Sequence, residues 1–542
     1  MPSVKPPSPS PSPTLELDFL DSPDSPLLTP TSTSPTQLHK LPKWLTPQQS
    51  CLRQFLNRLY STAKSLLTRT LTFLTPRLTW RYALLATSTI YILLCFAFQT
   101  PPFAHNLPAY TGPHAVGTID LEIPLNPPRL ISDTIYKDTS KPAFELQTVL
   151  FTLYYPTNKD YKSPHPLHYW IPKPISLTAR GFAKFAHADY FFIRPIFTFA
   201  LWAMVGSVTI PAEVDAPLLT SQEKHKHPVM VFSHGMASSR TDYTNYLGEL
   251  ASRGYVIAAL EHRDGSSPGS LVKTIQSTRE VVHFRGEDLL LSNKSSISTP
   301  QLKVEQLAFR DAEILATIST LKFINQGSES DSSSIYESSS RSEGKSLPTF
   351  TQKLDFNKLL IGGHSYGATG ALQSLKHASS SSPAAAGIIL DPGKESGPLN
   401  AEIDVPILVV HSNSWSKSHS VFFGRPHFDT VRDLVIDVLN RTGAAWFFTS
   451  LGTSHPSVTD APLIEPLLLS WTTGANLNTK EALREYVRVS DDFLRFVSNN
   501  ETRDILTEEV THEEYNTWVS EERKKSYPTD LARLWEIHVS PA

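Results

Sequence analysis

The second half of the chain alternates between short apolar runs and stretches with helical periodicity. The apolar runs are rich in Val, Ile, Leu and Phe, and glycine, proline or polar residues bound them, as is typical of strands. They are VMVF (229–232), YVIAALEH (255–262), LLIGG (359–363), GIILD (387–391), PILVVHS (406–412) and AWFFTSLG (445–452). Continuous apolar strands that alternate with helices predict an α/β fold, in which helices cover both faces of a mostly parallel sheet. Ligands of such sheets bind at the carboxyl ends of the strands, so the polar residues there are the candidates for chemistry.

A long helix is predicted between the second and third of these strands. Its apolar face consists of Leu307, Ile314, Leu315, Ile318 and Leu321. The insert that follows, residues 327–346, is rich in serine and acidic residues. This composition is typical of a mobile loop.

One uninterrupted apolar stretch precedes the alternating region. YALLATSTIYILLCFAF, residues 82–98, has no charged residue across 17 positions, which is near the lower limit for a helix that crosses a bilayer. Basic residues precede it, and no Lys or Arg follows until Arg129. The positive-inside rule then places the N-terminus in the cytosol and the large C-terminal part in a lumen or outside the cell. We therefore expect an uncleaved signal anchor and a single-pass membrane protein, with a buried core helix as the alternative.

Composition narrows the remaining possibilities. The first 48 residues are crowded with Pro, Ser and Thr and cannot bury enough apolar surface to offset chain entropy, so a disordered tail is expected.

The net charge of -3 over 542 residues gives no reason to expect nucleic acid as a partner. Cys51 and Cys95 are the only cysteines, which excludes a disulfide scaffold and a cysteine-rich zinc site. The sequence contains no Walker-type loop, dinucleotide fingerprint or metal-ligand cluster, so neither a cofactor nor a metal is expected.

A second apolar region, YFFIRPIFTFALWAMVG at residues 190–206, is broken by Arg194 and Pro195. About ten unbroken apolar residues remain, too few to cross a bilayer. Two alternatives stay open. The region is either a buried helix or a surface helix whose aromatic face dips into lipid.

The run from Gly363 to Gly367, GHSYG, fits the pattern G-x-S-x-G. It follows an apolar strand and precedes a helix of small residues, which is the context that a nucleophile elbow requires. The sharp turn exposes the hydroxyl of Ser365 at the top of the sheet, and the glycines relieve the clashes that side chains would cause there. Ser365 is therefore the predicted nucleophile.

A serine hydroxyl needs a base, and the base needs a group that orients it. In this class of fold the acid and then the histidine follow the serine along the chain. Asp391 stands directly at the end of a strand, whereas Asp404 precedes the next strand and Asp429 lies in a helical stretch. His455 follows the last clear strand. We predict Asp391 as the acid and His455 as the base.

Three other histidines fit the position of the base less well. His411 ends an inner strand, and His419 and His427 fall in the loop that follows.

Negative charge that develops on a substrate oxygen needs backbone donors. One is expected to be the N–H of Tyr366, directly after the nucleophile, and the other comes from the loop after an early strand. The stretch VFSHGMASS suits that loop, because Gly235 permits a tight turn and Met236 could present its N–H. His234 in the same loop is interpreted as a structural hydrogen-bonding residue, and an ordinary glycine turn is the simpler alternative for the whole stretch.

These motifs together resemble the platelet-activating-factor acetylhydrolase family of plasma type. The resemblance extends over roughly residues 110–499 and includes several motifs in the same order. They are YTGPHAVGTIDLEIP, FTLYYPT, HYWIPKP, GSVTIPAEVDAPL, VFSHGMASSRTDYTNYLGELASRGYVIAALEHRDGSS, GGHSYGATGAL, LDPG, PILVVHSNSW and GTSHPSVTD.

The resemblance implies an α/β-hydrolase fold and a metal-independent serine esterase. Such an enzyme hydrolyses the sn-2 acyl group of glycerophospholipids and favours acetyl, short or oxidised chains. The family's triad corresponds to Ser365, Asp391 and His455, and its oxyanion donors correspond to Met236 and Tyr366.

The partners implied are a phospholipid substrate and a lipid bilayer. The region 190–206 would correspond to the family's membrane-contacting surface, which favours the lipid-facing alternative for it. Replacement of the family's bulkier residues after the acid by Pro392 and Gly393 could alter the depth of the pocket.

The expected organisation along the chain combines these features. It comprises a disordered tail (1–48), a basic juxtamembrane segment (49–81), the transmembrane anchor (82–98), the α/β-hydrolase catalytic domain (105–500) with its insert (327–346), and a C-terminal extension (501–542). The alternatives for function are another serine hydrolase, acting on neutral esters, and an inactive membrane-tethered lipid binder.

Overall fold

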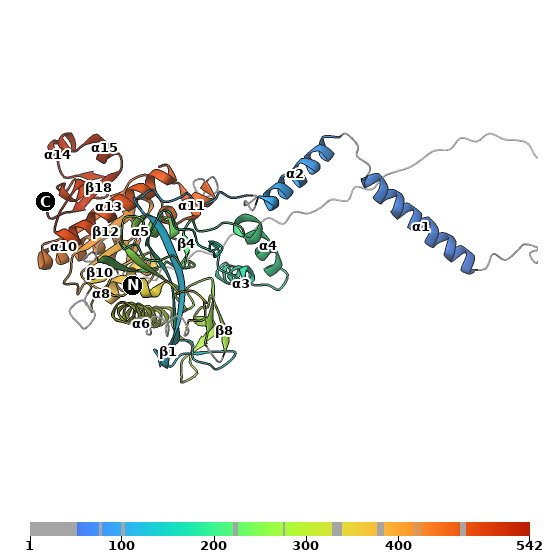
Figure 1. The fold of residues 1–542 in the computed structure, drawn as a ribbon, viewed down its shortest axis with the longest axis horizontal. Coiled ribbons are helices and arrows are strands. Elements are labelled where there is room, and N and C mark those ends of the chain that lie inside the picture. The colour runs from blue at the N-terminus through green and yellow to red at the C-terminus, as the bar shows by residue number, and fades with distance from the viewer. Residues whose placement is uncertain are drawn as a thin grey trace, which may run out of the picture. The chain divides into compact units, whose positions relative to one another are not determined.

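The computed structural model describes most of the chain (Figure 1). The described residues are 51–74, 79–98, 103–220, 226–274, 277–327, 339–376, 384–417, 420–422, 424–466 and 473–542. The predicted disordered tail, 1–48, lies outside the described residues, and so does most of the serine-rich insert.

A ten-stranded sheet forms the centre of the part of the chain that follows α2. Its order is β18-β15-β12-β11-β10-β5-β6-β3-β1-β4. The strands are β1 (Ala115–Leu130), β3 (Glu145–Thr157), β4 (Glu213–Val214), β5 (His227–Ser233), β6 (Val256–Leu260), β10 (Leu354–His364), β11 (Ala386–Leu390), β12 (Ile407–Ser412), β15 (Ala445–Ser450) and β18 (Trp535–Val539).

The six strands from β15 to β6 are parallel to one another, as the sequence predicts. Antiparallel pairing occurs where β18 joins β15, where β3 joins β6 and where β1 joins β3. All six predicted apolar runs form strands of this sheet. Their carboxyl ends therefore meet along one edge, which positions the site.

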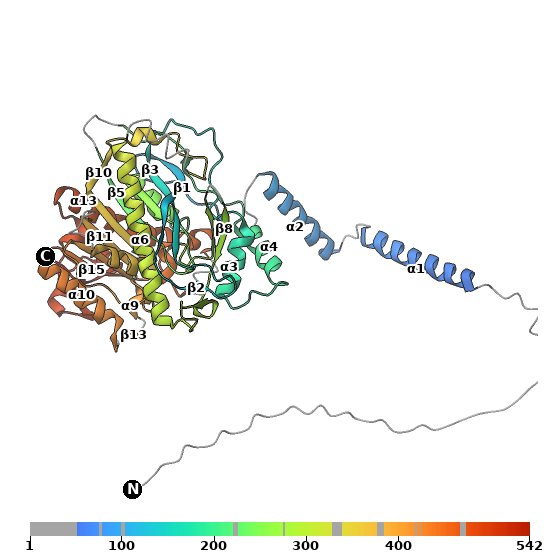
Figure 2. The ribbon, with the colours of Figure 1, turned by 90° about the horizontal axis from the view of Figure 1, so that it is seen from below.

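Helices cover both faces of the sheet (Figure 2). The described helices are α1 (Cys51–Leu74), α2 (Trp80–Ala97), α3 (Ile175–Phe185), α4 (Arg194–Val205), α5 (Thr244–Ala251), α6 (Thr299–Gln326), α8 (Tyr366–Leu375), α9 (Asn413–Lys417), α10 (His427–Thr442), α11 (Ala461–Ile464), α13 (Thr479–Asn499), α14 (Glu521–Ser526) and α15 (Thr529–Ala532). Short two-stranded ribbons complete the fold. They pair β2 (Ile135–Tyr136) with β9 (Leu289–Leu290), β7 (Gly269–Lys273) with β8 (Thr278–Val282), β13 (Val421–Phe422) with β14 (Arg425–Pro426), and β16 (His512–Glu514) with β17 (Thr517–Trp518).

Alternating residues of the central strands belong to two separate cores. In β5, Val229 and Val231 belong to the core that includes side chains of α6, α8 and α10, whereas Met230 and Phe232 belong to the core that includes side chains of α5 and α13. Successive side chains of a strand point to opposite faces, so a strand that is apolar at every position needs cover on both. This is why the sequence shows continuous apolar runs instead of an alternating pattern.

Parts of the serine-rich insert (327–346) and of the C-terminal extension (501–542) belong to the folded structure. Residues 328–338 of the insert lie outside the described residues, but Ser340 and Arg341 contact the buried carboxylate of Glu122 in β1. The C-terminal extension contributes β18 to the edge of the sheet, where Trp535 and Ile537 are buried.

One expectation about the N-terminal region is wrong. The apolar stretch 82–98 falls almost entirely in α2, an 18-residue helix that also contains Arg81 and the polar run 87–89. Among the described helices, none combines the length and the apolar character needed to cross a membrane. This finding overturns the predicted transmembrane helix. The predicted location, a single-pass protein with a cytosolic N-terminus and a lumenal or extracellular catalytic domain, is withdrawn with it.

Candidate active site

Ser365 lies at the sharp turn between β10 and α8. Its backbone has φ 56° and ψ -121°, a combination that L-residues rarely adopt and that persists only where the surroundings enforce it. A Cβ at Gly367 would lie 1.9 Å from the carbonyl oxygen of Ser233, and a Cβ at Gly363 would lie 2.3 Å from the carbonyl oxygen of Gly367. Only glycine fits at either position, so the motif is a steric requirement of this turn.

The three predicted side chains meet at the carboxyl edge of the sheet. Nδ1 of His455 lies 2.8 Å from Oδ2 of Asp391, and Nε2 of His455 lies 3.0 Å from Oγ of Ser365. A carboxylate only accepts hydrogen bonds, so Nδ1 carries the imidazole proton and Nε2 accepts the hydroxyl proton of Ser365. The tautomer that a general base requires is therefore already set.

Asp391 directly follows β11 and is buried. The backbone N–H of Ser412 donates to it at 2.6 Å, and the hydroxyl of the same residue donates at 2.7 Å. Burial disfavours the charged carboxylate, but the neighbouring imidazoles of His364 and His455 favour it more strongly and hold the pKa of Asp391 well below its usual range. The acid is therefore an anion at neutral pH.

The alternative acids and bases lie elsewhere in the fold. Asp404 pairs with Arg441, and Asp429 pairs with Arg432 in α10. His411 is buried beside Ser416, 3.3 Å from its hydroxyl. His427 is the first residue of α10, and His419 lies outside the described residues.

Trp415 packs against the catalytic imidazole, a contact that the sequence analysis did not find. Its ring is stacked on that of His455 with centroids 3.9 Å apart and planes 10° apart, and its Nε1–H donates to the carbonyl of Pro392 at 3.0 Å. In addition, the backbone N–H of His455 donates to Oγ of Ser414 at 3.0 Å. The stretch HSNSW contained these residues, but a Trp after a strand carries no signal of its own until the loops are placed.

The loop after β5 lies against the nucleophile. A Cβ at Gly235 would come within 3.1 Å of Cβ of Ser365, which places the neighbouring N–H of Met236 at the same edge. Tyr366 is the first residue of α8, so its N–H has no acceptor within the helix. Among the residues that the structure describes, neither of these two N–H groups has a hydrogen-bond acceptor. Both are available to an oxyanion.

His234 has the surroundings expected of a structural residue. Its Nε2 accepts the N–H of His262 at 3.1 Å, and burial together with the charge of Arg310 lowers the pKa of His234 to about 3. A group that is neutral and hydrogen-bonded in this way is unsuited to act as a second base.

A metal ion could in principle be bound by only one group of side chains in the described part of the chain. It consists of His364, Asp391 and His455, whose ligand atoms lie within 4.8 Å of one another. Two of these residues already hydrogen-bond to each other, and Nε2 of His455 faces Ser365. A cation bound to Nε2 would compete with the hydroxyl proton of Ser365 for the lone pair of that nitrogen.

The sequence matches the model of one protein family over residues 102–514 (platelet-activating factor acetylhydrolase, isoform II). The chain belongs to this family. Three relatives named platelet-activating factor acetylhydrolase illustrate the distance. The dog (Canis lupus familiaris) protein is 27% identical over 50% of this chain and 52% of its own length. The bovine (Bos taurus) protein is 28% identical over 50% of this chain and 52% of its own length. The guinea pig (Cavia porcellus) protein is 26% identical over 58% of this chain and 63% of its own length.

The chain thus spans about half the length of the first of these relatives. A comparison of folds pairs it with a ferulic acid esterase from Streptomyces cinnamoneus, with a TM-score of 0.48 and 16% identity over 75% of this chain and 96% of that one. A likeness this distant has no bearing on function.

Proposed function

We propose that this member of the acetylhydrolase family is a serine esterase that hydrolyses the sn-2 acyl ester of glycerophospholipids. The observation that carries the proposal is the hydrogen-bonded series from Ser365 through His455 to Asp391, with two backbone donors beside the serine. Family membership adds the substrate class, and acetyl, short or oxidised acyl chains are the preferred substrates.

The geometry supports a two-step mechanism. Nε2 of His455 takes the hydroxyl proton while Oγ of Ser365 attacks the ester carbonyl, and the carboxylate of Asp391 stabilises the imidazolium. The N–H groups of Met236 and Tyr366 bind the oxyanion, and each lowers the barrier by about 3 kcal/mol. His455 then protonates the departing glyceryl oxygen. Water, deprotonated by the same imidazole, releases the acyl group from Ser365 and leaves a lysophospholipid and a carboxylic acid.

The surface around α4 is suited to contact lipid, and we include this contact in the proposal. Most of the region 190–206 forms the surface helix α4, which follows a turn at residues 190–193, and six aromatic or aliphatic side chains of the turn and the helix are widely exposed. They are Tyr190, Phe191, Phe192, Ile196, Phe199 and Trp202. A groove of about 680 Å³ runs between α3 and α4, lined by Phe191, Phe199 and Trp202 among others. Monomeric soluble proteins seldom expose such a continuous apolar patch unless something covers it.

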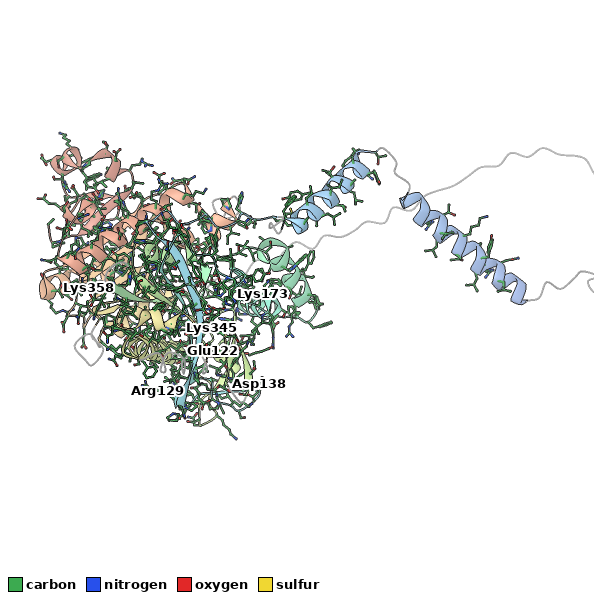
Figure 3. All side chains as sticks on the ribbon, in the orientation of Figure 1. Glu122, Arg129, Asp138, Lys173, Lys345 and Lys358 are labelled. Carbon is green, nitrogen blue, oxygen red and sulfur yellow. The ribbon has the colours of Figure 1, made fainter. Side chains whose placement is uncertain are left out.

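Basic side chains border this apolar surface. Lys173 lies beside α3 and α4 (Figure 3) and donates to the carbonyl of Gly206, just beyond α4, at 3.1 Å. Arg180 and Arg194 line the groove and form ion pairs with Asp189 and Glu280. Exposed aromatic residues with cations at the rim are the pattern of a helix that lies in a lipid interface.

The test is hydrolysis of a panel of glycerophospholipids that differ in sn-2 chain, with Ser365→Ala as the control. We expect turnover of acetyl and short-chain substrates, and a loss of roughly a million-fold in Ser365→Ala with the fold unchanged, because only the nucleophile is removed. Turnover retained in that variant would refute the assignment of Ser365. Activity restricted to soluble nitrophenyl esters would identify a neutral-ester hydrolase, and failure of a fluorophosphonate to label Ser365 would identify an inactive lipid binder.

A further inference from the structure

A series of buried polar groups connects the loop after β5 with the acid of the triad. Gly235 donates its N–H to the hydroxyl of Tyr243 at 3.2 Å. That hydroxyl lies 2.8 Å from Nδ1 of His364, whose Nε2 lies 3.9 Å from Oδ2 of Asp391. Tyr243 is 1% exposed and His364 is 3% exposed, so bulk water does not compete for these contacts.

The carboxylate of Asp391 indicates where the protons of this series lie. The Tyr243 oxygen receives the N–H of Gly235 and directs its own proton to Nδ1 of His364, because a proton on Nδ1 would leave the lone pair of Nε2 facing the carboxylate. Burial, with a smaller contribution from the neighbouring His455, lowers the pKa of His364 to about 4, so the ring is neutral at pH 7. A neutral imidazole with an accepting Nδ1 carries its proton on Nε2, the nitrogen nearer to Asp391.

At the far end of the series, His364 interacts with Asp391 electrostatically and not through a hydrogen bond. Nε2 of His364 has no hydrogen-bond partner among the described residues, and 3.9 Å is too long for a hydrogen bond. The N–H dipole nevertheless lies close to the oxygen of Asp391 that His455 also contacts, and the rings of His364 and His455 are 4.5 Å apart. The carboxylate thus receives one imidazole N–H directly and faces another.

Tyr243 holds the loop at the position where the oxyanion is stabilised. A Cβ at Gly235 would lie 3.1 Å from Cβ of Ser365 and 3.3 Å from Oη of Tyr243, so the backbone of Gly235 is enclosed between the nucleophile and this hydroxyl. Met236 is the next residue. Oxyanion donors lose most of their effect when they are displaced by about 1 Å, so an anchor directly beside Met236 matters for turnover.

We propose that Tyr243 is a positioning residue, whose hydroxyl holds the His234–Gly235 peptide so that the adjoining N–H of Met236 is placed for oxyanion binding, and which, through His364, links this loop to Asp391. The proposal rests on the serine-esterase chemistry of the proposed function, but not on its lipid substrate.

The test compares Tyr243→Phe with Tyr246→Phe, using p-nitrophenyl acetate as the substrate. Tyr246 is the matched control, because it is buried nearby in α5 and its hydroxyl lies 2.7 Å from Oγ of Ser490, which belongs to α13. Each variant removes one buried, hydrogen-bonded hydroxyl. We expect kcat to fall by about 10- to 100-fold in Tyr243→Phe with KM changed by less than about threefold, and both constants to stay near wild type in Tyr246→Phe.

A second readout separates positioning from general destabilisation. A trifluoromethyl ketone forms a hemiketal with Ser365 that places an oxyanion between the donors, so its Ki should rise in Tyr243→Phe by the same factor as kcat/KM falls. If the two Phe variants have equal kcat, or if the loss in Tyr243→Phe is entirely in KM, the proposal is overturned.

A pair of substitutions at His364 keeps the test decisive if Tyr243→Phe does not fold. His364→Gln retains an acceptor for the tyrosine hydroxyl and a donor toward Asp391, whereas His364→Leu retains neither. We expect the glutamine variant to keep about tenfold more kcat than the leucine variant, and equal values would refute the proposal. Failure of wild-type enzyme on phospholipids but not on p-nitrophenyl acetate would contradict the proposed substrate and leave this inference intact.

Discussion

At Ser365 the backbone adopts a conformation that isolated serine avoids, and its surroundings account for it. The flanking positions admit only glycine, because a Cβ at Gly363 or Gly367 would overlap backbone atoms. The sequence predicted this turn because the steric requirement is local and leaves its mark within five residues. His455 and Asp391 were predicted from their order and from strand ends, which is weaker information, since several histidines and acids satisfied it.

Three residues around the site were not predicted as part of it. Trp415, Tyr243 and His364 contact the site through packing and buried hydrogen bonds. They lie far apart along the chain, and their side chains are common in protein cores. Only the distances between them in the fold distinguish them from other buried aromatic residues.

The ionisation of Asp391 links folding stability to pH. Its folded pKa lies below the usual range, so the unfolded chain takes up the proton first as the pH falls. The stabilisation is fully present above the unfolded pKa of about 4 and is lost as the pH falls below that value. Asp391→Asn removes the titrating group. We expect the difference in free energy of unfolding between wild type and this variant, measured by urea denaturation, to shrink from about pH 6 to about pH 3. A difference that stays constant over this interval would contradict the assignment.

At the scale of elements, the strands were predicted more accurately than the surface helix. Each of the six apolar runs forms a strand because it is buried on both faces, and this leaves a continuous pattern in the sequence. The region 190–206 was ambiguous, because the same apolar composition suits a buried helix and an exposed one. Exposure of Phe199 in α4 at 66% decides between the two.

Two glycines of α8 should respond very differently to alanine. At Gly367 a Cβ would lie 1.9 Å from a backbone oxygen, whereas at Gly370 the nearest atom would be 3.5 Å away, in the side chain of Arg310. We expect Gly367→Ala to lower the free energy of unfolding by more than about 3 kcal/mol, because backbone must shift, and Gly370→Ala to raise it by up to about 1 kcal/mol through helix propensity. Thermal and urea unfolding measure both. Equal stability of the two variants would show that the turn is not as tight as described.

The exposed face of α4 can be tested apart from catalysis. Phe199 in α4 is 66% exposed, and Phe323 in α6 is 48% exposed and serves as the control. Insertion of one Phe side chain into lipid contributes about 1.5–3 kcal/mol, so Phe199→Ala should weaken binding to phosphatidylcholine vesicles, measured by co-sedimentation, by roughly 10- to 100-fold. Phe323→Ala should leave it unchanged, and both variants should keep their activity on p-nitrophenyl acetate. Equal vesicle binding by the two variants would exclude α4 as the lipid-contacting element.

At the scale of the whole molecule, the C-terminal segment belongs to the sheet. β18 pairs with β15, the strand that leads to His455, and Trp535 is 1% exposed. From the sequence, residues 501–542 were assigned to a C-terminal extension, because they lie beyond the stretch, roughly 110–499, that resembles the family. Pairing between strands so distant in sequence leaves no local signal.

Removal of β18 should therefore weaken the site as well as the fold. A chain that ends at Leu534 loses several buried side chains and uncovers the edge of β15, so we expect a loss of more than about 4 kcal/mol in the free energy of unfolding. A chain that ends at Ser540 lacks only the exposed residues Pro541 and Ala542 and serves as the control. The midpoint of thermal unfolding measures both, and equal midpoints would show that β18 is dispensable.

The sequence by itself determined the parallel sheet, the turn at Ser365 and the family, because these depend on local sterics, on burial of whole strands and on motifs in a fixed order. It did not determine correctly whether the N-terminal region crosses a membrane. The stretch predicted to do so forms a helix that contains a polar run and is not apolar enough to cross one. The tertiary structure decided which histidine and which acid meet the serine, and which buried hydroxyl supports the oxyanion loop. The two contacts of the triad join residues 64 and 90 positions apart, and the contact of Tyr243 with His364 spans 121 positions, so they become defined only when the chain closes around its sheet.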